Sequence, residues 1–280
     1  MDDSYIHRPV RSAESVTELG AAVRGAVLVA GSHAGIIAAY LGAKAGAHAL
    51  ILNDAGVGRD AAGIAGLEYL QAIGMGAAAV AHTSARIGDG ADALRRGVIS
   101  HRNAIAAQLG VVPGMAAAEA AHLLGRAPIP GEPPPYRDGR WRIGACAAGE
   151  VWALDSVGKL EREDDGRILL IGSNGGLHGG RPDSALNLQG APVAARVAVF
   201  NDAGVGIDGV GITRLPALQQ RGVPAVTIDC MSARIGDGRS MWDGGVLSHV
   251  NDAAAALGAR AGDGLRTWIE SLPAPAQAPG

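Results

Sequence analysis

The sequence predicts an α/β fold of two tandem duplicated lobes, each built from parallel strand–helix units of Rossmann-like type and related by a pseudo-two-fold axis. Three observations lead to it: an internal repeat, short apolar runs that end at glycine, and a helical pattern after each run. Between Asn53–Gly110 and Asn201–Gly258, 30 of 58 positions are identical at a constant offset of 148. Such a duplication predicts that the same fold occurs twice.

The apolar runs are the expected strands. Short, continuous apolar segments are typical of strands that are buried on both faces of a parallel sheet. Strands are expected at 26–30, 49–52 and 77–81, and in the second copy at 168–171. Alternation of strands with helices predicts right-handed crossovers between parallel strands.

The segments between these strands carry helical signals. We expect helices at 36–45, around 64–70, at 91–109 and at 115–124. Asp60 and Asp208 are interpreted as N-caps, Gly74 as a helix stop, and Asp89 and Asp237 as further N-caps. The predicted organisation is a first repeat at 1–125, a proline-rich connector at 126–150 and a second repeat at 151–280.

The composition excludes several classes of protein. Of 280 residues, 48% are hydrophobic and 43 are glycine, but only 3% are aromatic. The aliphatic content argues against disorder, and glycine without a period of three argues against collagen. A net charge of −3 and few rings disfavour nucleic-acid binding. Two cysteines, an acidic N-terminus and the lack of a long apolar run predict a cytoplasmic protein that does not bind membranes.

Three motifs shared by the copies directly follow predicted strands. In open parallel sheets, ligands bind beyond the carboxyl ends of the strands, so these loops are the candidate site. The alternative is that such loops need Gly, Asn, Asp and Ser as turn and cap residues in any case. Gly31-Ser32-His33-Ala34-Gly35 matches Gly172-Ser173-Asn174-Gly175-Gly176 at an offset of 141. Its glycine-rich backbone suits an anion, with Ser32, Ser173, Asn174 and Gly175 as substrate-binding residues, or alternatively forms a tight turn.

The second motif, Asn-Asp-Ala-Gly-Val-Gly, places carboxylates at strand ends. Asp54 and Asp202 are candidate bases or metal ligands, and Asn53 and Asn201 candidate substrate ligands. The segment Asn53–Leu67 is similar to the Asn-Asp-Asp-Gly loop of stationary-phase survival nucleotidases, which bind a divalent metal. Alanine replaces the second acid here, and we do not assign the chain to that family. A divalent metal is possible, and no organic cofactor is predicted.

The third motif, Ser-Ala-Arg-Ile-Gly-Asp-Gly, supplies Arg86 and Arg234. A guanidinium on a loop of small residues suits a substrate carboxylate or phosphate, and the alternative is an ion pair with Asp54 or Asp202. Ser100-His101 and Ser248-His249 fall within the predicted closing helices, where hydrogen bonds in packing are the favoured interpretation.

Differences between the copies are a further signal. His33 aligns with Asn174 and His82 with Cys230, and seven extra residues after Gly176 contribute His178. One composite site would use such asymmetry, with His33 or His178 as proton carrier beside Asp54 or Asp202. Ordinary divergence of loop sequences explains the same differences equally well. We therefore expect a hydrolase, or a proton-transfer isomerase, acting on a small anionic metabolite between the repeats. The alternatives are a non-catalytic ligand-binding protein and a nucleotide-dependent oxidoreductase. Homo-oligomerisation is a default expectation without a motif.

Overall fold

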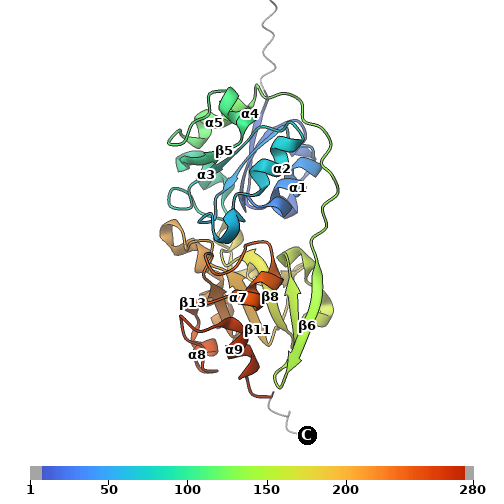
Figure 1. Ribbon diagram of the computed structural model, residues 1–280, viewed down its shortest axis with the longest axis vertical. Coiled ribbons are helices and arrows are strands. Elements are labelled where there is room, and N and C mark those ends of the chain that lie inside the picture. Colours follow the sequence, from blue (N-terminus) through green and yellow to red (C-terminus); the bar gives the residue numbers. More distant parts are fainter. Residues whose placement is uncertain (1–7, 275–280) are drawn as a thin grey trace, which may run out of the picture.

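The structure is a computed structural model that describes residues 8–274. It is a mixed α/β protein with two sheets of mostly parallel strands, one in each half of the chain. The two halves are stacked end to end along the long axis of the molecule (Figure 1). None of the helices in residues 8–274 is long and apolar enough to cross a membrane.

The first sheet has the strand order β1-β2-β3-β4-β5. Strands β1 to β4 are parallel, and β5 pairs antiparallel with β4 at the edge. The bounds are β1 Val10–Ala13, β2 Val27–His33, β3 Ala49–Asn53, β4 Ala77–Val80 and β5 Ile99–Arg102. Every residue of β2, β3 and β4 is buried, as the continuous apolar runs predict.

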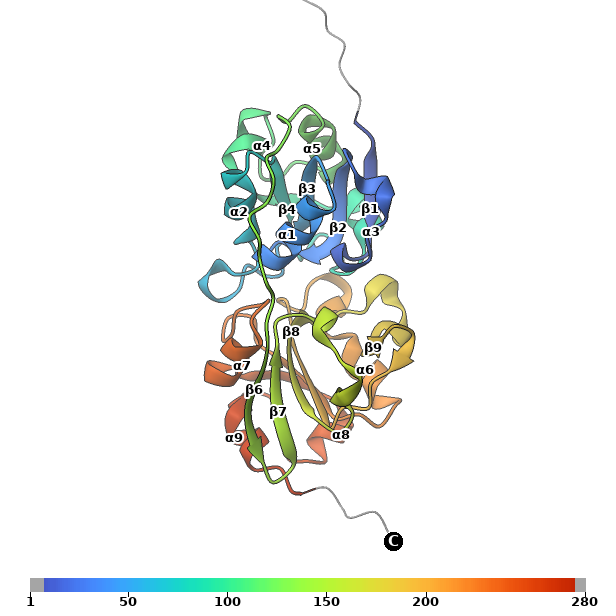
Figure 2. The same ribbon diagram turned by 90° about the vertical axis from the view of Figure 1, so that its right-hand side faces the viewer.

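The second sheet has the order β13-β12-β11-β8-β7-β6. Its strands β7, β8, β11 and β12 are parallel, and β6 and β13 are antiparallel edges. The bounds are β6 Arg140–Cys146, β7 Gly149–Leu154, β8 Ile168–Asn174, β11 Val197–Asn201, β12 Ala225–Ile228 and β13 Leu247–Val250. This sheet therefore begins within the segment 126–150 that the sequence assigns to the connector. Residues 128–139 carry no helix or strand and run along one side of the molecule (Figure 2).

Helices cover both faces of each sheet. In the first half, α1 and α2 pack on one face, and α3 and α5 on the other. In the second half, α6 lies on one face and α7, α8 and α9 on the other. The bounds are α1 Ile36–Lys44, α2 Gly66–Ala72, α3 Gly90–Arg96, α4 Ala104–Gln108, α5 Ala117–Leu124, α6 Arg214–Gln219, α7 Gly238–Gly244, α8 Asp252–Ala255 and α9 Leu265–Glu270.

The predicted helix at 91–109 is wrong, because the chain there forms α3, β5 and α4. Gly97 ends α3 at its C-cap, and a Cβ at this position would clash with the Ala93 carbonyl oxygen. The chain then extends to pair with β4. Ser100 is therefore on an edge strand rather than on a helix, and β13 places Ser248 in the same way.

The described segment 175–196, between β8 and β11, contains no counterpart of α1. Two short 3₁₀ turns (His178–Gly180 and Pro182–Ser184) and a small hairpin, β9 Asn187–Leu188 with β10 Ala191–Pro192, lie between β8 and β11 instead. Arg214 fills the adjoining space, since it is fully buried and donates to the carbonyl oxygens of Gly176, Ser184 and Ala185. The first half has Gly66 at the equivalent position, packed against α1.

Candidate functional site

The two halves meet at the carboxyl ends of their parallel strands. The loops after β3 and β11 touch there, and a Cβ on Gly56 would lie only 3.0 Å from the Gly204 Cα. Both loops are left-handed, with φ of 50° to 74° over residues 55–58 and 51° to 72° over 203–206. The shared motifs therefore form the junction between the halves.

Asn53 and Asn201 hold these loops in shape. The Oδ1 atom of Asn53 accepts from the Ala55 amide at 2.9 Å, and its Nδ2 donates to the Ala85 carbonyl at 3.1 Å. Asn201 makes the same two bonds, to Ala203 and Ala233, at the same distances. Both side chains are almost fully buried, and their hydrogen bonds fix the shape of the two loops.

The contacts across the junction are reciprocal. The Arg59 amide donates to the Cys230 carbonyl at 2.8 Å, and Ile207, at the position equivalent to Arg59, donates to the His82 carbonyl at 2.8 Å. Such a pattern, in which residue i contacts j and j contacts i, is that of an isologous interface.

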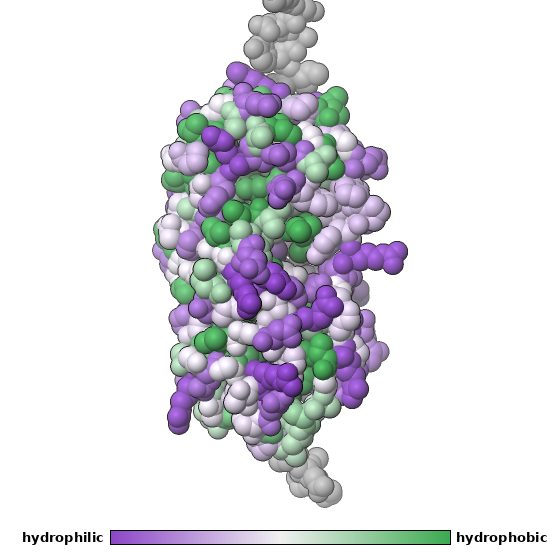
Figure 3. Space-filling view, viewed as in Figure 1, coloured by the Kyte–Doolittle hydropathy of each residue, from purple (hydrophilic) through white to green (hydrophobic). Residues whose placement is uncertain are grey.

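Arg86 and Arg234 take part in this reciprocal interface. Arg86 Nε lies 2.9 Å from Asp208 Oδ2, and Arg234 Nη1 lies 3.0 Å from Asp60 Oδ2. All four side chains are more than two-fifths exposed, and hydrophilic residues occupy the junction on one face of the molecule (Figure 3). The partners are thus Asp208 and Asp60, not the Asp54 and Asp202 of the alternative interpretation.

Replacing both arginines by glutamine should test whether they act as inter-half ties. Exposed ion pairs contribute little, so we expect Arg86→Gln/Arg234→Gln to lower the melting temperature by about 1–3 °C. The loss should shrink at 1 M salt, where the Debye length is about 3 Å. Arg266→Gln, which breaks an ion pair within α9, is the matched control. A drop in melting temperature that is unchanged at 1 M salt would contradict the role of the two arginines as ties between the halves.

The structure corrects one set of capping assignments and confirms another. Asp60 and Asp208 are not N-caps, since each has a left-handed φ within a 3₁₀ turn and its carboxylate pairs with an arginine of the other half. Asp89 and Asp237 are N-caps, and each accepts from an amide three residues on.

Asp54 is the centre of a hydrogen-bond network that joins three elements. Its Oδ1 lies 2.8 Å from His82 Nδ1 and accepts from the amides of His82 and Gly56, while Oδ2 accepts from the Ser100 hydroxyl at 2.8 Å. Asp54 is 3% exposed, and the His82 side chain is 26% exposed. A buried carboxylate thus orients an imidazole that solvent can reach.

The charges of this pair are coupled. Burial opposes ionisation of Asp54, but hydrogen bonds from His82 and Ser100 outweigh it and lower its pKa below the ordinary value. The hydrogen bond to Asp54 raises the pKa of His82 against the effect of burial, and Asp202 adds to the rise. The pKa of His82 therefore depends on both candidate aspartates. Because Nδ1 bonds to Asp54, the Nε2 atom is the one available for proton exchange.

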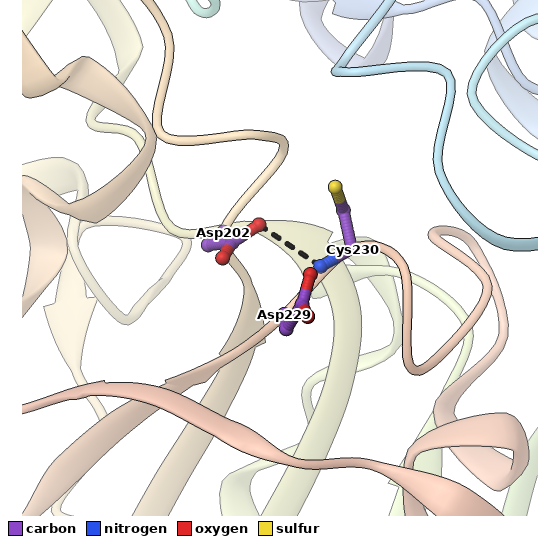
Figure 4. Close-up of side chains that lie close together, drawn as sticks. All are labelled: Asp202, Asp229 and Cys230. Carbon is purple, nitrogen blue, oxygen red and sulfur yellow. Dashed lines mark hydrogen bonds between the residues drawn. The ribbon is translucent and has the colours of Figure 1, made fainter. Parts of the chain in front are cut away.

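The equivalent group in the second half differs. Asp202 Oδ1 accepts from the amides of Gly204 and Cys230, but Ser248 bonds Thr227 rather than the carboxylate. Asp202, Asp229 and Cys230 lie together there (Figure 4), with one potential ligand atom from each within 4.8 Å of the others.

This cluster is the set of described residues best placed to hold a metal. Two carboxylates and a thiol are ligands that zinc accepts. Burial, followed by Asp202 and Asp229, raises the pKa of the Cys230 thiol to about 12. The thiol is therefore protonated at neutral pH, and metal binding would have to displace that proton.

Five of the predicted site residues line a single cavity between the halves. The cavity of about 40 Å³ lies at the ends of β2 and β8 and is lined by Ser32, His33, Ser173, Asn174 and His178. It shares His178 with a groove of about 530 Å³ along 181–190, and His33 with a cavity of about 200 Å³ that Arg234 also lines. Gly175 follows Asn174 in the chain. Asp54, Asp202, Asn53, Asn201 and Arg86 are not part of these linings.

Both histidines of this cavity are poor proton carriers at neutral pH. Burial lowers the pKa of His33 to about 4. Burial, together with Arg214 and Arg181, lowers that of His178 to about 4 as well. They are therefore neutral at pH 7 and act as hydrogen-bonding groups.

No catalytic or binding role is predicted from the sequence for His82, Asp229 or Arg214, and for Ser100 only hydrogen bonds in packing are predicted. The one available signal was the replacement of His82 by Cys230 between the copies. Comparisons with family models, curated proteins and solved structures give no match to this chain.

Proposed function

We propose that the protein is an enzyme of small-molecule metabolism that uses His82 as general acid and base. The substrate is a small anionic metabolite bound between the halves, and the reaction is hydrolysis or isomerisation by proton transfer. The two halves are, in this proposal, duplicated Rossmann-like units that form one composite site. The observation that carries it is the 2.8 Å contact between buried Asp54 and His82 at the junction.

The chemistry follows from this contact. Asp54 fixes the ring with Nδ1 toward the carboxylate, so Nε2 exchanges the proton with water or substrate. The hydrogen bond to Asp54 raises the pKa of His82 from its ordinary value, so the ring is a stronger base than a free imidazole. The role expected for His33 and His178 thus passes to His82, because their pKa values near 4 leave them weak bases.

Activity on small-molecule panels tests this proposal. Small carboxylate esters and lactones would be screened for acid release, and hydroxy and keto acids for deuterium exchange from solvent by NMR. We expect His82→Asn to lower kcat about 10²- to 10⁴-fold. Asp54→Asn should shift the basic limb of the pH–rate profile to lower pH, since it removes the group that raises the pKa of His82.

A matched control is Ser248→Ala, which alters the strand position equivalent to Ser100 but leaves the Asp54 network intact. It should retain full activity. Turnover that is unchanged in His82→Asn would contradict the proposal.

A non-catalytic ligand-binding protein is the second candidate. The cavities between the halves favour it, because their linings do not include His82. Ligand binding without turnover in every panel would support this function over the first.

A further inference from the structure

Three side chains that line the 40 Å³ cavity each have one N–H group that donates to none of residues 8–274. The Gly35 amide donates to His33 Nδ1 at 3.1 Å, so Nδ1 is the acceptor and Nε2 of the neutral ring carries the hydrogen. The Gly176 amide donates to Asn174 Oδ1 at 2.9 Å, which leaves the Nδ2 hydrogens free. No acceptor for His33 Nε2 or Asn174 Nδ2 occurs among residues 8–274.

His178 completes the set. Arginine can only donate, so the 3.4 Å contact between Arg214 Nη2 and His178 Nε2 makes Nε2 the acceptor and Nδ1 the donor. His33 and Asn174 are each 7% exposed. All three side chains line the cavity, so a ligand there that supplies acceptors can bond to their N–H groups.

A buried positive charge lies next to these donors. Arg214 is fully buried, and its guanidinium bonds to three carbonyl oxygens and His178, without a carboxylate among the described residues. Burial lowers its pKa to about 10, so it remains charged at pH 7. Glu14 also lines the cavity, but it pairs with Arg181 at 3.2 Å.

The volume limits the ligand group. A water needs about 10–15 Å³ of such space, so 40 Å³ admits about three water-sized groups. A carboxylate, with one carbon and two oxygens, has that size and offers only acceptors. The adjoining 530 Å³ groove has room for the remainder of a small molecule.

We propose that this cavity binds the carboxylate group of a small organic acid, held by His33, Asn174 and His178. This inference goes beyond the proposed function, because the linings of the cavity and the groove do not include His82. It assigns a carboxylate-binding site that is separate from the Asp54–His82 pair, with donors that replace Arg86 and Arg234 as the anion ligands.

Titration of the ¹⁵N-labelled full chain with acetate at constant ionic strength tests it. The Gly35 and Gly176 amides, which bond to His33 and Asn174, are the reporters. We expect saturable shifts with a Kd of about 1–10 mM, as suits so small a ligand. Acetamide, the neutral isostere, should not produce them. Absence of shifts up to 100 mM acetate, or equal shifts with acetamide, would overturn the proposal.

Variants separate the site from general anion binding. Asn174→Asp replaces a donor by a charge that repels acetate and should weaken binding at least tenfold, while its Oδ1 still accepts from Gly176. His33→Asn keeps an N–H donor, as Asn174 does at the equivalent position, and should retain binding, whereas His33→Leu should lose it. Unchanged affinity in Asn174→Asp would overturn the assignment.

The two proposals fail independently. Acetate binding with turnover unaffected by His82→Asn would remove the acid–base role but keep the carboxylate site. Loss of turnover in His82→Asn without acetate binding would remove the carboxylate site alone.

Discussion

Replacing Gly56 by alanine is expected to destabilise the protein by about 2–5 kcal/mol. Gly56 has φ +74°, and a Cβ there would lie 3.0 Å from the Gly204 Cα and 3.2 Å from the Cys230 sulfur. The left-handed backbone costs an alanine about 1–2 kcal/mol, and the clash with backbone of the other half adds about 1–3 kcal/mol. Urea unfolding of both proteins measures the difference.

Gly74→Ala is the control for backbone conformation. Gly74 has φ +75°, and a Cβ there would meet no atom within 4 Å. The Gly74→Ala variant should therefore lose only the stability that a left-handed alanine costs. The additional loss of unfolding free energy in Gly56→Ala measures the contact between the halves. Equal losses in the two variants would show that the halves do not meet at Gly56.

Replacing His33 by asparagine is expected to make the protein less sensitive to acid. The pKa of His33 is about 4 in the folded state and about 6.5 when unfolded. Between these values the unfolded chain binds the extra proton, so stability falls as pH falls. At 1.36 kcal/mol per unit, His33 accounts for a loss of about 3 kcal/mol between pH 6.5 and pH 4. Urea unfolding at pH 7 and pH 4.5 should show most of this loss abolished in His33→Asn.

His82→Asn is the matched control, because its effect has the opposite sign. The pKa of His82 is raised in the folded state, so its contribution is present below pH 6.5 and is lost as pH rises through the folded pKa. The His82→Asn substitution should leave the pH dependence of the unfolding free energy between pH 4.5 and pH 6.5 nearly unchanged. An unchanged slope in His33→Asn would contradict burial of a neutral imidazole.

Much of the architecture follows from local sequence. The apolar runs lie in β2, β3, β4 and β8 because strands buried on both faces need no alternation. Helices α1, α2 and α5 lie where periodicity and glycine stops predict them. Strand β5 was missed because an edge strand of four residues, Ile99–Arg102, has a polar surface and too short a pattern to be distinguished from the end of a helix.

The candidate site was predictable in location but not in its pairings. Residues at the carboxyl ends of parallel strands do meet, and five of the predicted residues share one cavity. The hydrogen bond from Ser100 to Asp54 depended on β5, since that strand carries Ser100. The partner of each arginine depended on how the halves are stacked.

The sequence by itself determined the α/β class, the repeated motifs and their place at strand ends, because these depend on burial patterns and short-range turn chemistry. The division into two separate sheets is a finding of the structure. Only the tertiary structure decided that Asp54 orients His82, that Arg86 and Arg234 tie the halves together, and that Arg214 lies buried beside the cavity. Those contacts join residues from 28 to 174 positions apart. Their geometry depends on how the sheets, loops and halves pack, and no local pattern encodes it.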